Sequence, residues 1–291
     1  MIEQVRSFNR LVTQSVGALH DHYLSRSLPL GEARVLWEIG SDGCDVRTLR
    51  VRLELDSGYL SRLLRSLEDG GFVRVRPSPD DRRVRTASLT AAGLRERERL
   101  DRRSDELAES LLAPLSLSQR ERLVTAMGEV ERLLTAGLVR IDVVDPESPA
   151  AEYCLGEYYA EIGRRFEDGF DHTISLAATP EQLRLPAGLF VVAFLHGEPV
   201  GSGALKFHGR RPAELKRMWV APRARGLGLG RRLLVELERV AAEHGVRTLR
   251  LETNKSLVEA ISLYRSSGWR EVPAFNHERY AHHWFEKRLR P

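Results

Sequence analysis

A glycine-rich segment at residues 220–230, VAPRARGLGLG, most constrains how this chain can fold. It follows an apolar run, ELKRMWV, that is typical of a strand, and it precedes RRLLVELERVAAEHG, whose apolar residues recur at helical spacing. Gly226, Gly228 and Gly230 let the backbone approach a ligand closely and point several N–H groups the same way. The helix start adds partial positive charge, and Arg223 and Arg225 add formal charge. The segment therefore predicts a strand–turn–helix unit that binds a pyrophosphate.

Length and composition set the outer limits. A chain of 291 residues with 42% hydrophobic residues suggests two globular domains, and a net charge of +4 gives only a weak indication of an anionic partner. Cys44 and Cys154 stand alone, so we expect a reducing compartment and no metal site. The N-terminus lacks the apolar core of a signal peptide, and no apolar run approaches the roughly 18 residues of a membrane span. We expect a cytoplasmic protein with no membrane partner.

The first part of the chain has a helical pattern with a distinctive fourth helix. Helical spacing predicts helices over residues 2–25, 30–39 and 46–53. Asp56 or Ser57 then caps GYLSRLLRSLEDGG, whose four leucines form one apolar stripe. The opposite face carries residues that suit DNA, namely Ser57, Tyr59, Ser61, Arg62 and Arg65. Two short helices joined by a tight turn predict a helix-turn-helix with this face as its recognition surface.

A basic hairpin follows the helix-turn-helix. Residues 72–76 and 84–89 alternate as strands, and the turn between them leads to Arg82, Arg83 and Arg85. Residues 47–85 hold ten Arg against six Asp or Glu, whereas the first 138 residues hold 22 Arg against 21 acids. The positive charge is therefore concentrated on the helix-turn-helix and the hairpin, as a phosphate-binding face requires. We predict that these three arginines contact DNA, with Arg82 or Arg83 reaching a minor groove.

With these features, residues 1–137 resemble the MarR family of winged-helix regulators. The resemblance lies in DSGYLSRLLRSLEDGGFV and in the wing motif D-x-R…LT-x-x-G, which is Asp81, Arg83, Leu89, Thr90 and Gly93. It implies a homodimer on a double-stranded DNA operator, built by the first helix and the last two. For those two we predict residues 92–112 and a helix that a Ser118–Glu121 capping box opens. In the wing, Asp81 is also a candidate to fix Arg83 by an internal salt bridge.

The second half reads as a mixed α/β domain over residues 138–291. Apolar runs predict strands at residues 138–144, 189–195, 199–207, 214–220, 248–254, 269–272 and 283–289. Helices are predicted from about Pro149 to Phe166, over residues 231–245 and from about Ser256 to Tyr264. Strands and helices that alternate in this way predict a sheet covered by helices.

This half is similar to the GNAT acetyltransferases. The similarity lies in KRMWV before the glycine segment, LGRRLL after it and TNKSLVEAISLYRSSGW further on. A Rossmann site lacks its ribose-binding acid, and a Walker site lacks its G-K-[ST] lysine. The resemblance implies an α/β fold with a mixed, mostly antiparallel sheet, and it implies acetyl-CoA as the acetyl donor without a metal.

The resemblance also implies individual roles. The CoA pyrophosphate should bind the glycine segment, and pantetheine should lie along the strand before it, between that strand and a diverging one at residues 248–254. Tyr264 matches the general acid that protonates the leaving thiolate, a role that suits a phenol. Glu214 is our first candidate for the base and Glu252 our second. The predicted cofactor-binding residues are Met218, Trp219, Val220, Arg225, Gly226, Leu227, Gly228, Leu229, Gly230, Arg231 and Asn254.

The acceptor is an amine that the sequence leaves unidentified. Aromatic residues in and after the first helix of this half are candidates for its pocket, although we favour the interpretation that half of them belong to a core or an interface. They are Tyr153, Tyr158, Tyr159, Phe166 and Phe170. Direct transfer requires no nucleophilic thiol, so Cys154 is interpreted as a packing residue.

Our leading hypothesis is a regulator that binds DNA and acetylates a small molecule or a protein. In one alternative the second domain only senses acetyl-CoA or another ligand. In another the winged helix only mediates dimerisation of a protein acetyltransferase.

Overall fold

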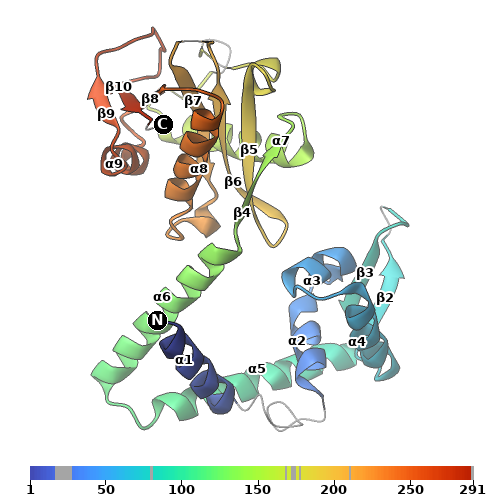
Figure 1. Ribbon diagram of the computed structural model, residues 1–291. Coiled ribbons are helices and arrows are strands. Elements are labelled where there is room, and N and C mark those ends of the chain that lie inside the picture. The colour runs from blue at the N-terminus through green and yellow to red at the C-terminus, as the bar shows by residue number, and fades with distance from the viewer. Residues whose placement is uncertain are drawn as a thin grey trace. The chain divides into compact units, whose positions relative to one another are not determined.

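The computed structural model describes residues 1–16, 28–78, 81–167, 169–171, 175–176, 178–209 and 211–289 (Figure 1). The chain forms two compact units, Met1–Met127 and Gly128–Pro291. Helix α6, Leu117–Leu138, crosses this division and ends where we placed the domain boundary. The boundary at residues 137 and 138 stays a prediction.

The N-terminal unit combines helices with a small antiparallel sheet. Its other elements are α1 Ile2–Ser15, α2 Leu30–Ile39, β1 Cys44–Asp45, α3 Val46–Arg52, α4 Ser57–Asp69, β2 Val73–Pro77, β3 Arg85–Leu89 and α5 Ala91–Leu112. The sheet has the order β1-β3-β2, so the predicted hairpin gains a short third strand that the sequence pattern did not indicate. The predicted helix-turn-helix and wing are confirmed, although residues 17–25 of the first predicted helix lie outside the described residues.

Helix α4 is positioned by a polar cap and an apolar stripe. The Asp56 carboxylate accepts a hydrogen bond from the backbone N–H of Tyr59 at 2.8 Å, which satisfies a helix-terminal donor. The stripe is fully formed, because Leu60, Leu63, Leu64 and Leu67 are all buried in the core of this unit. The opposite face of α4 is consequently left at the surface.

The LT-x-x-G motif fastens the wing to helix α5. The Thr90 hydroxyl donates to the Gly71 carbonyl at 2.7 Å and accepts from the Gly93 backbone N–H at 3.1 Å. Gly93 lies so close to β2 that an added Cβ would meet the Phe72 carbonyl oxygen at 2.1 Å. Only glycine allows this approach between the first turn of α5 and the start of the wing.

The capping box of α6 differs from our prediction. The Ser116 hydroxyl accepts from the Gln119 backbone N–H at 3.4 Å, and the Gln119 side chain accepts from the Ser116 backbone N–H at 2.9 Å. The Ser118–Glu121 box was wrong, because the helix begins at Leu117 and Ser118 already lies inside it.

The C-terminal unit is a seven-stranded sheet with helices on both faces. Its elements are β4 Arg140–Val144, α7 Pro149–Arg165, β5 Gly188–Leu195, β6 Glu198–Lys206, β7 Ala213–Val220, α8 Leu229–Glu243, β8 Thr248–Thr253, α9 Val258–Ser266, β9 Arg270–Val272 and β10 His283–Arg288. The sheet order is β4-β5-β6-β7-β8-β10-β9, with every neighbouring pair antiparallel except β7 and β8. The predicted mixed, mostly antiparallel sheet is confirmed.

Helices α7 and α8 lie on opposite faces of the central strands. Trp219 of β7 contacts Tyr153 of α7 ring to ring at 6.4 Å, whereas Gly203 of β6 faces Leu237 of α8. The Cys154 thiol packs in this core and donates to the Gly201 carbonyl at 3.7 Å. Burial raises the pKa of Cys154 to about 11, so the thiol stays protonated, in agreement with a packing role.

Replacement of Gly93 by alanine should destabilise the protein by about 1–3 kcal/mol, the usual cost of forcing extra atoms into a packed contact. The added methyl group meets backbone rather than a flexible side chain, so the wing or α5 has to shift. Urea unfolding followed by far-ultraviolet circular dichroism measures the effect.

Gly163→Ala is the matched control, because Gly163 is exposed on α7 and nothing lies within 4 Å of its added Cβ. This change should stabilise its helix by about 0.5–1 kcal/mol. Equal stability of the two variants would contradict our account of the motif.

Candidate functional site

The parallel strands β7 and β8 pair over only two positions. Ala213 lies opposite Leu249, and Glu214 lies opposite Arg250. The strands continue to Val220 and Thr253 without further pairing between them in the described residues. The divergence expected here is therefore present, and it leaves an opening in the sheet below the glycine segment.

The glycine segment forms a tight turn before α8. Gly226 and Gly228 have φ angles of 82° and 71°, which L-residues rarely adopt, and α8 begins directly afterwards at Leu229. From Gly226 to Arg231, no backbone N–H donates to a protein acceptor in the part of the chain that the structure describes. The turn thus presents a set of free donors at a helix N-terminus, where negative charge is stabilised.

A cavity of about 550 Å³, here called the first cavity, extends from this turn to Tyr264. Its size is within the usual range for small-molecule sites. Apolar side chains from α7, from α9 and from the residue before α9 contribute to its lining, including Ile162, Leu263 and Leu257. Nine of the eleven predicted cofactor-binding residues line it, namely Met218, Trp219, Val220, Arg225, Gly226, Gly228, Leu229, Gly230 and Arg231.

The two other predicted cofactor residues lie elsewhere. Leu227 packs against the core of the unit. Asn254 lines a neighbouring cavity, where its amide donates to the Tyr280 carbonyl at 2.8 Å and its side-chain oxygen accepts from the backbone N–H and hydroxyl of Ser256. Asn254 thereby fixes the turn between β8 and α9.

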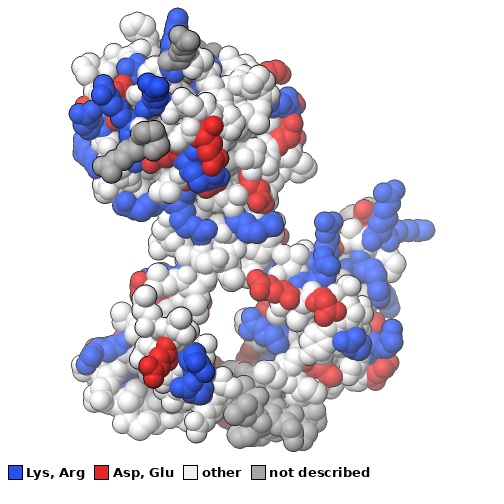
Figure 2. Space-filling view, viewed as in Figure 1, with Lys and Arg blue, Asp and Glu red and all other residues white. Residues whose placement is uncertain are grey.

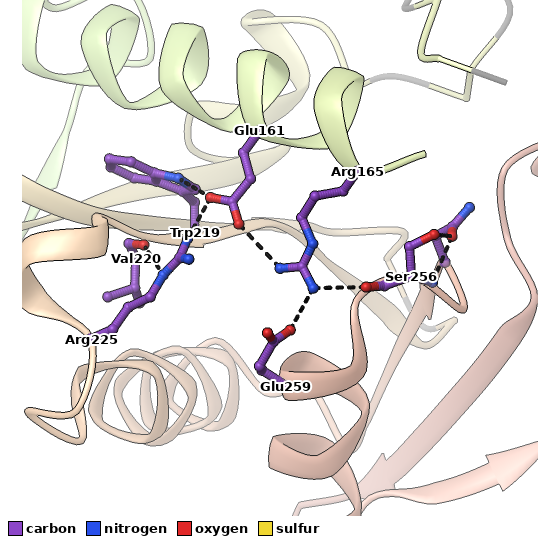
Figure 3. A network of polar contacts seen from close by, with 8 residues as sticks. Glu161, Arg165, Trp219, Val220, Arg225, Ser256 and Glu259 are labelled. Carbon is purple, nitrogen blue, oxygen red and sulfur yellow. Dashed lines mark hydrogen bonds and ion pairs between the residues drawn. The ribbon is translucent and has the colours of Figure 1, made fainter. Parts of the chain in front are cut away.

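A charged network borders the first cavity (Figure 3). The Glu161 carboxylate accepts from the Trp219 indole N–H at 3.0 Å, from the Arg225 guanidinium at 2.5 Å and from Arg165 at 3.2 Å. Arg165 also donates to Glu259 at 2.6 Å and to the Ser256 carbonyl at 2.7 Å. The network ties α7 to β7, the glycine turn and α9. Pairs such as Glu161 with Arg225, 64 residues apart, have no local sequence signal.

A second cavity, of about 100 Å³, adjoins the first. The two share the side chains Tyr158, Ile162, Met218, Leu257, Ala260 and Tyr264. The lining of the second cavity also includes the charged side chains Lys216, Arg217, Glu252 and Glu278. Tyr264 lies on the boundary between them.

The Tyr264 side chain is buried and its hydroxyl remains protonated. Its ring packs against Phe285 and Trp269, with centroid separations of 5.7 and 6.0 Å. Burial raises the pKa of this phenol, and the nearby Tyr158 hydroxyl and Glu252 carboxylate raise it further. Glu252 and Tyr264 line the same cavity.

Lys216 lies between two carboxylates at the start of the strand gap. Its ammonium contacts Glu214 at 3.0 Å and forms a short contact with Glu252. Burial works to raise the pKa of Glu214, but Lys216 and His208 outweigh it and hold that pKa below its usual range. Burial works to lower the pKa of Lys216, but Glu252 and Glu214 outweigh it and raise that pKa. Of the two predicted base candidates, Glu252 lines the second cavity, whereas Glu214 lines neither cavity.

Only some of the aromatic residues predicted for the acceptor pocket line the second cavity. Tyr158, Phe166 and Phe170 line the second cavity, whereas Tyr153 is half exposed on α7 and contacts Trp219. Tyr159 stacks on Phe170 at 5.8 Å behind the cavity wall. Arg217, which we did not predict, could have been noticed as a charged residue in the buried phase of β7.

The predicted DNA-contacting residues are all exposed on α4 and the wing, and Figure 2 shows Lys and Arg side chains gathered over the β2–β3 hairpin. The Arg62 guanidinium lies 5.5 Å from the centre of the Tyr59 ring. Asp81 accepts from the backbone N–H of Arg83 at 2.9 Å, and no Asp81–Arg83 ion pair is present among the described residues. The carboxylate therefore shapes the turn and leaves the guanidinium of Arg83 at the surface.

Two observations concern other kinds of site. Among the described residues, no helix is long and apolar enough to cross a bilayer. Within the same residues, no three or more His, Cys, Asp or Glu side chains are grouped to hold a metal ion.

Comparisons with known proteins agree with this geometry. The model of the acetyltransferase (GNAT) family matches residues 155–269, and the model of the MarR family matches residues 26–84. An IAA acetyltransferase of Azospirillum brasilense is 39% identical over 131 residues, which are 45% of this chain and 83% of that protein. A mycothiol acetyltransferase of Thermomonospora curvata is 30% identical over 281 residues, which are 86% of this chain and 91% of that protein. A GNAT-family acetyltransferase structure from Staphylococcus aureus covers 52% of this chain and all of its own, with 20% identity and a TM-score of 0.44.

The chain belongs to the GNAT acetyltransferase family and carries a MarR family domain ahead of its acetyltransferase domain. The predicted enzyme class and the predicted fusion are thereby confirmed.

Removal of the Lys216 charge by Lys216→Met should destabilise the protein by about 3 kcal/mol at pH 7, because two largely buried carboxylates lose their cation. In the wild type the depressed pKa of Glu214 contributes stability above its unfolded pKa, and that stability is lost as the pH falls. In the variant, protonation relieves the unpaired carboxylates, so acidification from pH 7 to pH 4.5 should cost less stability. Urea unfolding at both pH values measures this difference.

Lys255→Met is the control, because Lys255 pairs with Glu167 at the surface and exposed pairs contribute less than about 1 kcal/mol. A Lys216→Met variant with the wild-type dependence of stability on pH would disprove the central role of Lys216.

Proposed function

We propose that this protein transfers the acetyl group of acetyl-CoA to an amine, and that it binds operator DNA as a homodimer. The observation that carries the first part is the position of Tyr264 between two cavities, one of which ends at the free N–H groups of the glycine turn. Membership of the GNAT family supports the same reaction class. The acceptor enters from the second cavity in this proposal.

The first cavity fits the donor. The pyrophosphate would accept from the backbone N–H groups of residues 226–231, with Arg225 and Arg231 at the same end. The apolar side chains that line the cavity and the unpaired edge of β7 suit the pantetheine arm. Acetyl-CoA supplies a thioester carbonyl for attack by the amine and a thiolate as leaving group.

In this proposal Tyr264 is the general acid that protonates the departing thiolate of CoA. Its raised pKa keeps the hydroxyl protonated at neutral pH, so it holds a proton for the departing sulfur. Its position next to both cavities supports this role.

On the acceptor side we assign the base to Glu252, our second candidate from the sequence. Glu252 shares the second cavity with Tyr264, whereas Glu214 lies at the start of β7 against His208 at 3.1 Å and Lys216. Lys216 holds both carboxylates in place, and Glu252 keeps one buried oxygen without a hydrogen-bond partner in the described chain. Such an oxygen is available to accept a proton from an ammonium ion.

Three substitutions test these roles in an assay of free thiol release from acetyl-CoA, with a library of amines as acceptors. Tyr264→Phe and Glu252→Gln should each lower kcat by about 10²- to 10⁴-fold, the usual contribution of a general acid or base.

Glu214→Gln is the matched control, because it removes one Lys216 contact in the same way as Glu252→Gln does. We expect it to lower kcat less than tenfold. The reverse ranking of the two Glu variants would assign the base to Glu214, and full activity of Tyr264→Phe would remove the proposed acid.

The DNA part of the proposal depends on exposed surfaces of the N-terminal half. The outward face of α4 and the wing supply the arginines, and the apolar faces of α1 and α6 suit a second copy of the chain. Neither α1 nor α6 buries a residue, and both expose large apolar side chains, namely Val5, Phe8, Leu11, Val124, Met127, Leu133 and Leu134. Exposed apolar stripes of this kind mark protein interfaces.

Arg62→Ala should weaken binding to an operator by about 10- to 100-fold, because base and phosphate contacts by arginine contribute about 1–3 kcal/mol. The probe is a DNA duplex selected by the wild-type protein from a random-sequence pool, measured by fluorescence anisotropy at two salt concentrations. Two chains per duplex are expected.

Arg103→Ala is the control, since Arg103 lies on α5 and pairs with Glu106 at 3.7 Å. Failure of the wild type to select any duplex, or equal binding by both variants, would remove α4 as the recognition surface and favour a role in dimerisation alone.

A further inference from the structure

Arg217 lies in the second cavity and has no part in the chemistry proposed above. Its side chain is buried, with 8% of the residue exposed. Its guanidinium carbon lies 4.9 Å from the ring centre of Tyr159 and 5.6 Å from that of Tyr158. Within the described residues, no carboxylate lies at ion-pair distance from it. A buried cation without a carboxylate is costly, and arginine residues buried in this way are usually paired.

The other charges of the cavity already have partners. Lys216 lies between Glu214 and Glu252. Glu278 accepts from the Ser175 hydroxyl at 3.1 Å and from the Leu176 backbone N–H at 2.6 Å. These contacts neutralise or solvate the remaining groups, and they leave the positive charge of Arg217 facing the cavity.

The backbone at Arg217 is held in an unusual conformation. The register between β6 and β7 shifts between Ser202 and Ala204, so β7 bulges at this point. Arg217 has a φ angle of 56°, which is unfavourable for a residue with a Cβ, and its carbonyl accepts from the buried Ser202 hydroxyl at 3.1 Å. Strained residues that the surrounding structure holds in place cluster at binding and active sites. Arg217 thus combines a strained backbone conformation with a buried, charged side chain.

We propose that Arg217 binds a carboxylate group of the acetyl acceptor, so that the acceptor is an amine that also carries a carboxylate, with an amino acid as the simplest class. The planar guanidinium matches a carboxylate with two parallel hydrogen bonds, and stacking on Tyr158 and Tyr159 fixes its plane. The amine then lies toward Glu252 and Tyr264, which share the cavity. This inference rests on the proposed acetyl transfer.

The remaining wall of the cavity indicates which amino acids to use as probes. Phe170 packs against Tyr280 at 4.9 Å and against Phe166 at 5.9 Å, and all three line the cavity. Apolar side chains suit this wall. Phenylalanine, leucine and alanine, each compared with its carboxamide, are therefore the test pairs.

The first experiment compares each free acid with its amide in the acetyl-transfer assay of the full-length protein. The wild type should favour the acid in kcat/KM by about 30-fold or more, since an unpaired partner of a buried charge costs at least about 2 kcal/mol. The amide has the less basic amine, so the ionisation of the amine cannot produce this preference. Equal use of acids and amides would overturn the inference while the acetyl transfer itself stands.

The second experiment changes the cation. Arg217→Gln should reduce the preference for the acid to less than about threefold through a higher KM for the acid, with the KM for acetyl-CoA unchanged. Arg217→Lys, which keeps the charge but loses the planar fork, should fall between the two. Arg250→Gln is the control, because Arg250 of β8 pairs with Glu286 of β10 and lines neither cavity. A preference that survives Arg217→Gln would overturn the inference.

A third measurement is independent of turnover. Calorimetry on protein saturated with CoA should show binding of the acids but not of the amides, and Arg217→Gln should abolish it. If acids bind in this way and no compound is acetylated, the carboxylate site stands and the proposed transfer fails. If neither acids nor amides bind and simple amines without a carboxylate are acetylated, the inference fails and the transfer stands.

Discussion

The separation of β7 from β8 is the constraint on which the C-terminal unit depends. Two parallel strands normally satisfy each other's backbone groups along their whole length, yet here pairing ends after Glu214 and Arg250. Beyond that point the facing edge of β7 has no strand partner. Two cavities occupy the opening between the strands, and the glycine turn follows the unpaired end of β7. Backbone donors and empty space therefore occur together.

Most charged residues beside this opening in the sheet are paired with residues of opposite charge. Lys216 is 11% exposed and contacts Glu214 of its own strand and Glu252 of β8. Glu161 accepts from three donors at the border of the first cavity. Arg217 is the exception among the described residues, because aromatic rings and no carboxylate surround it. Buried charges that are paired with opposite charges serve the architecture, whereas a buried cation without a carboxylate partner leaves room for a ligand of opposite sign.

Much of this arrangement could be predicted from the sequence, because the signals are local. The apolar periodicity of α2 predicts its bounds, and the order of strand, glycine turn and helix brings most of the predicted cofactor-binding residues to one cavity. Where the local sequence allowed two interpretations, only the three-dimensional structure distinguished between them. Ser116 and Ser118 both begin a capping-box pattern, and only the true helix start distinguishes them. Both β7 and β8 border the second cavity, yet of Glu214 and Glu252 only Glu252 lines it, a difference that depends on the sheet and not on either residue's neighbours in sequence.

The first turn of α8 connects the proposed donor site to the helix that leads out of the N-terminal half. Arg232 follows the glycine turn directly, and its guanidinium donates to the carbonyls of Ala136 and Val139, the latter at 2.8 Å. These carbonyls lie at the end of α6, where a helix leaves acceptors unsatisfied and favours positive charge. The free N–H groups at the N-terminus of α8 and the contact with the end of α6 are therefore supplied by adjacent residues. Arg232 therefore holds the last residues of α6 and the first turn of α8 together within the C-terminal unit.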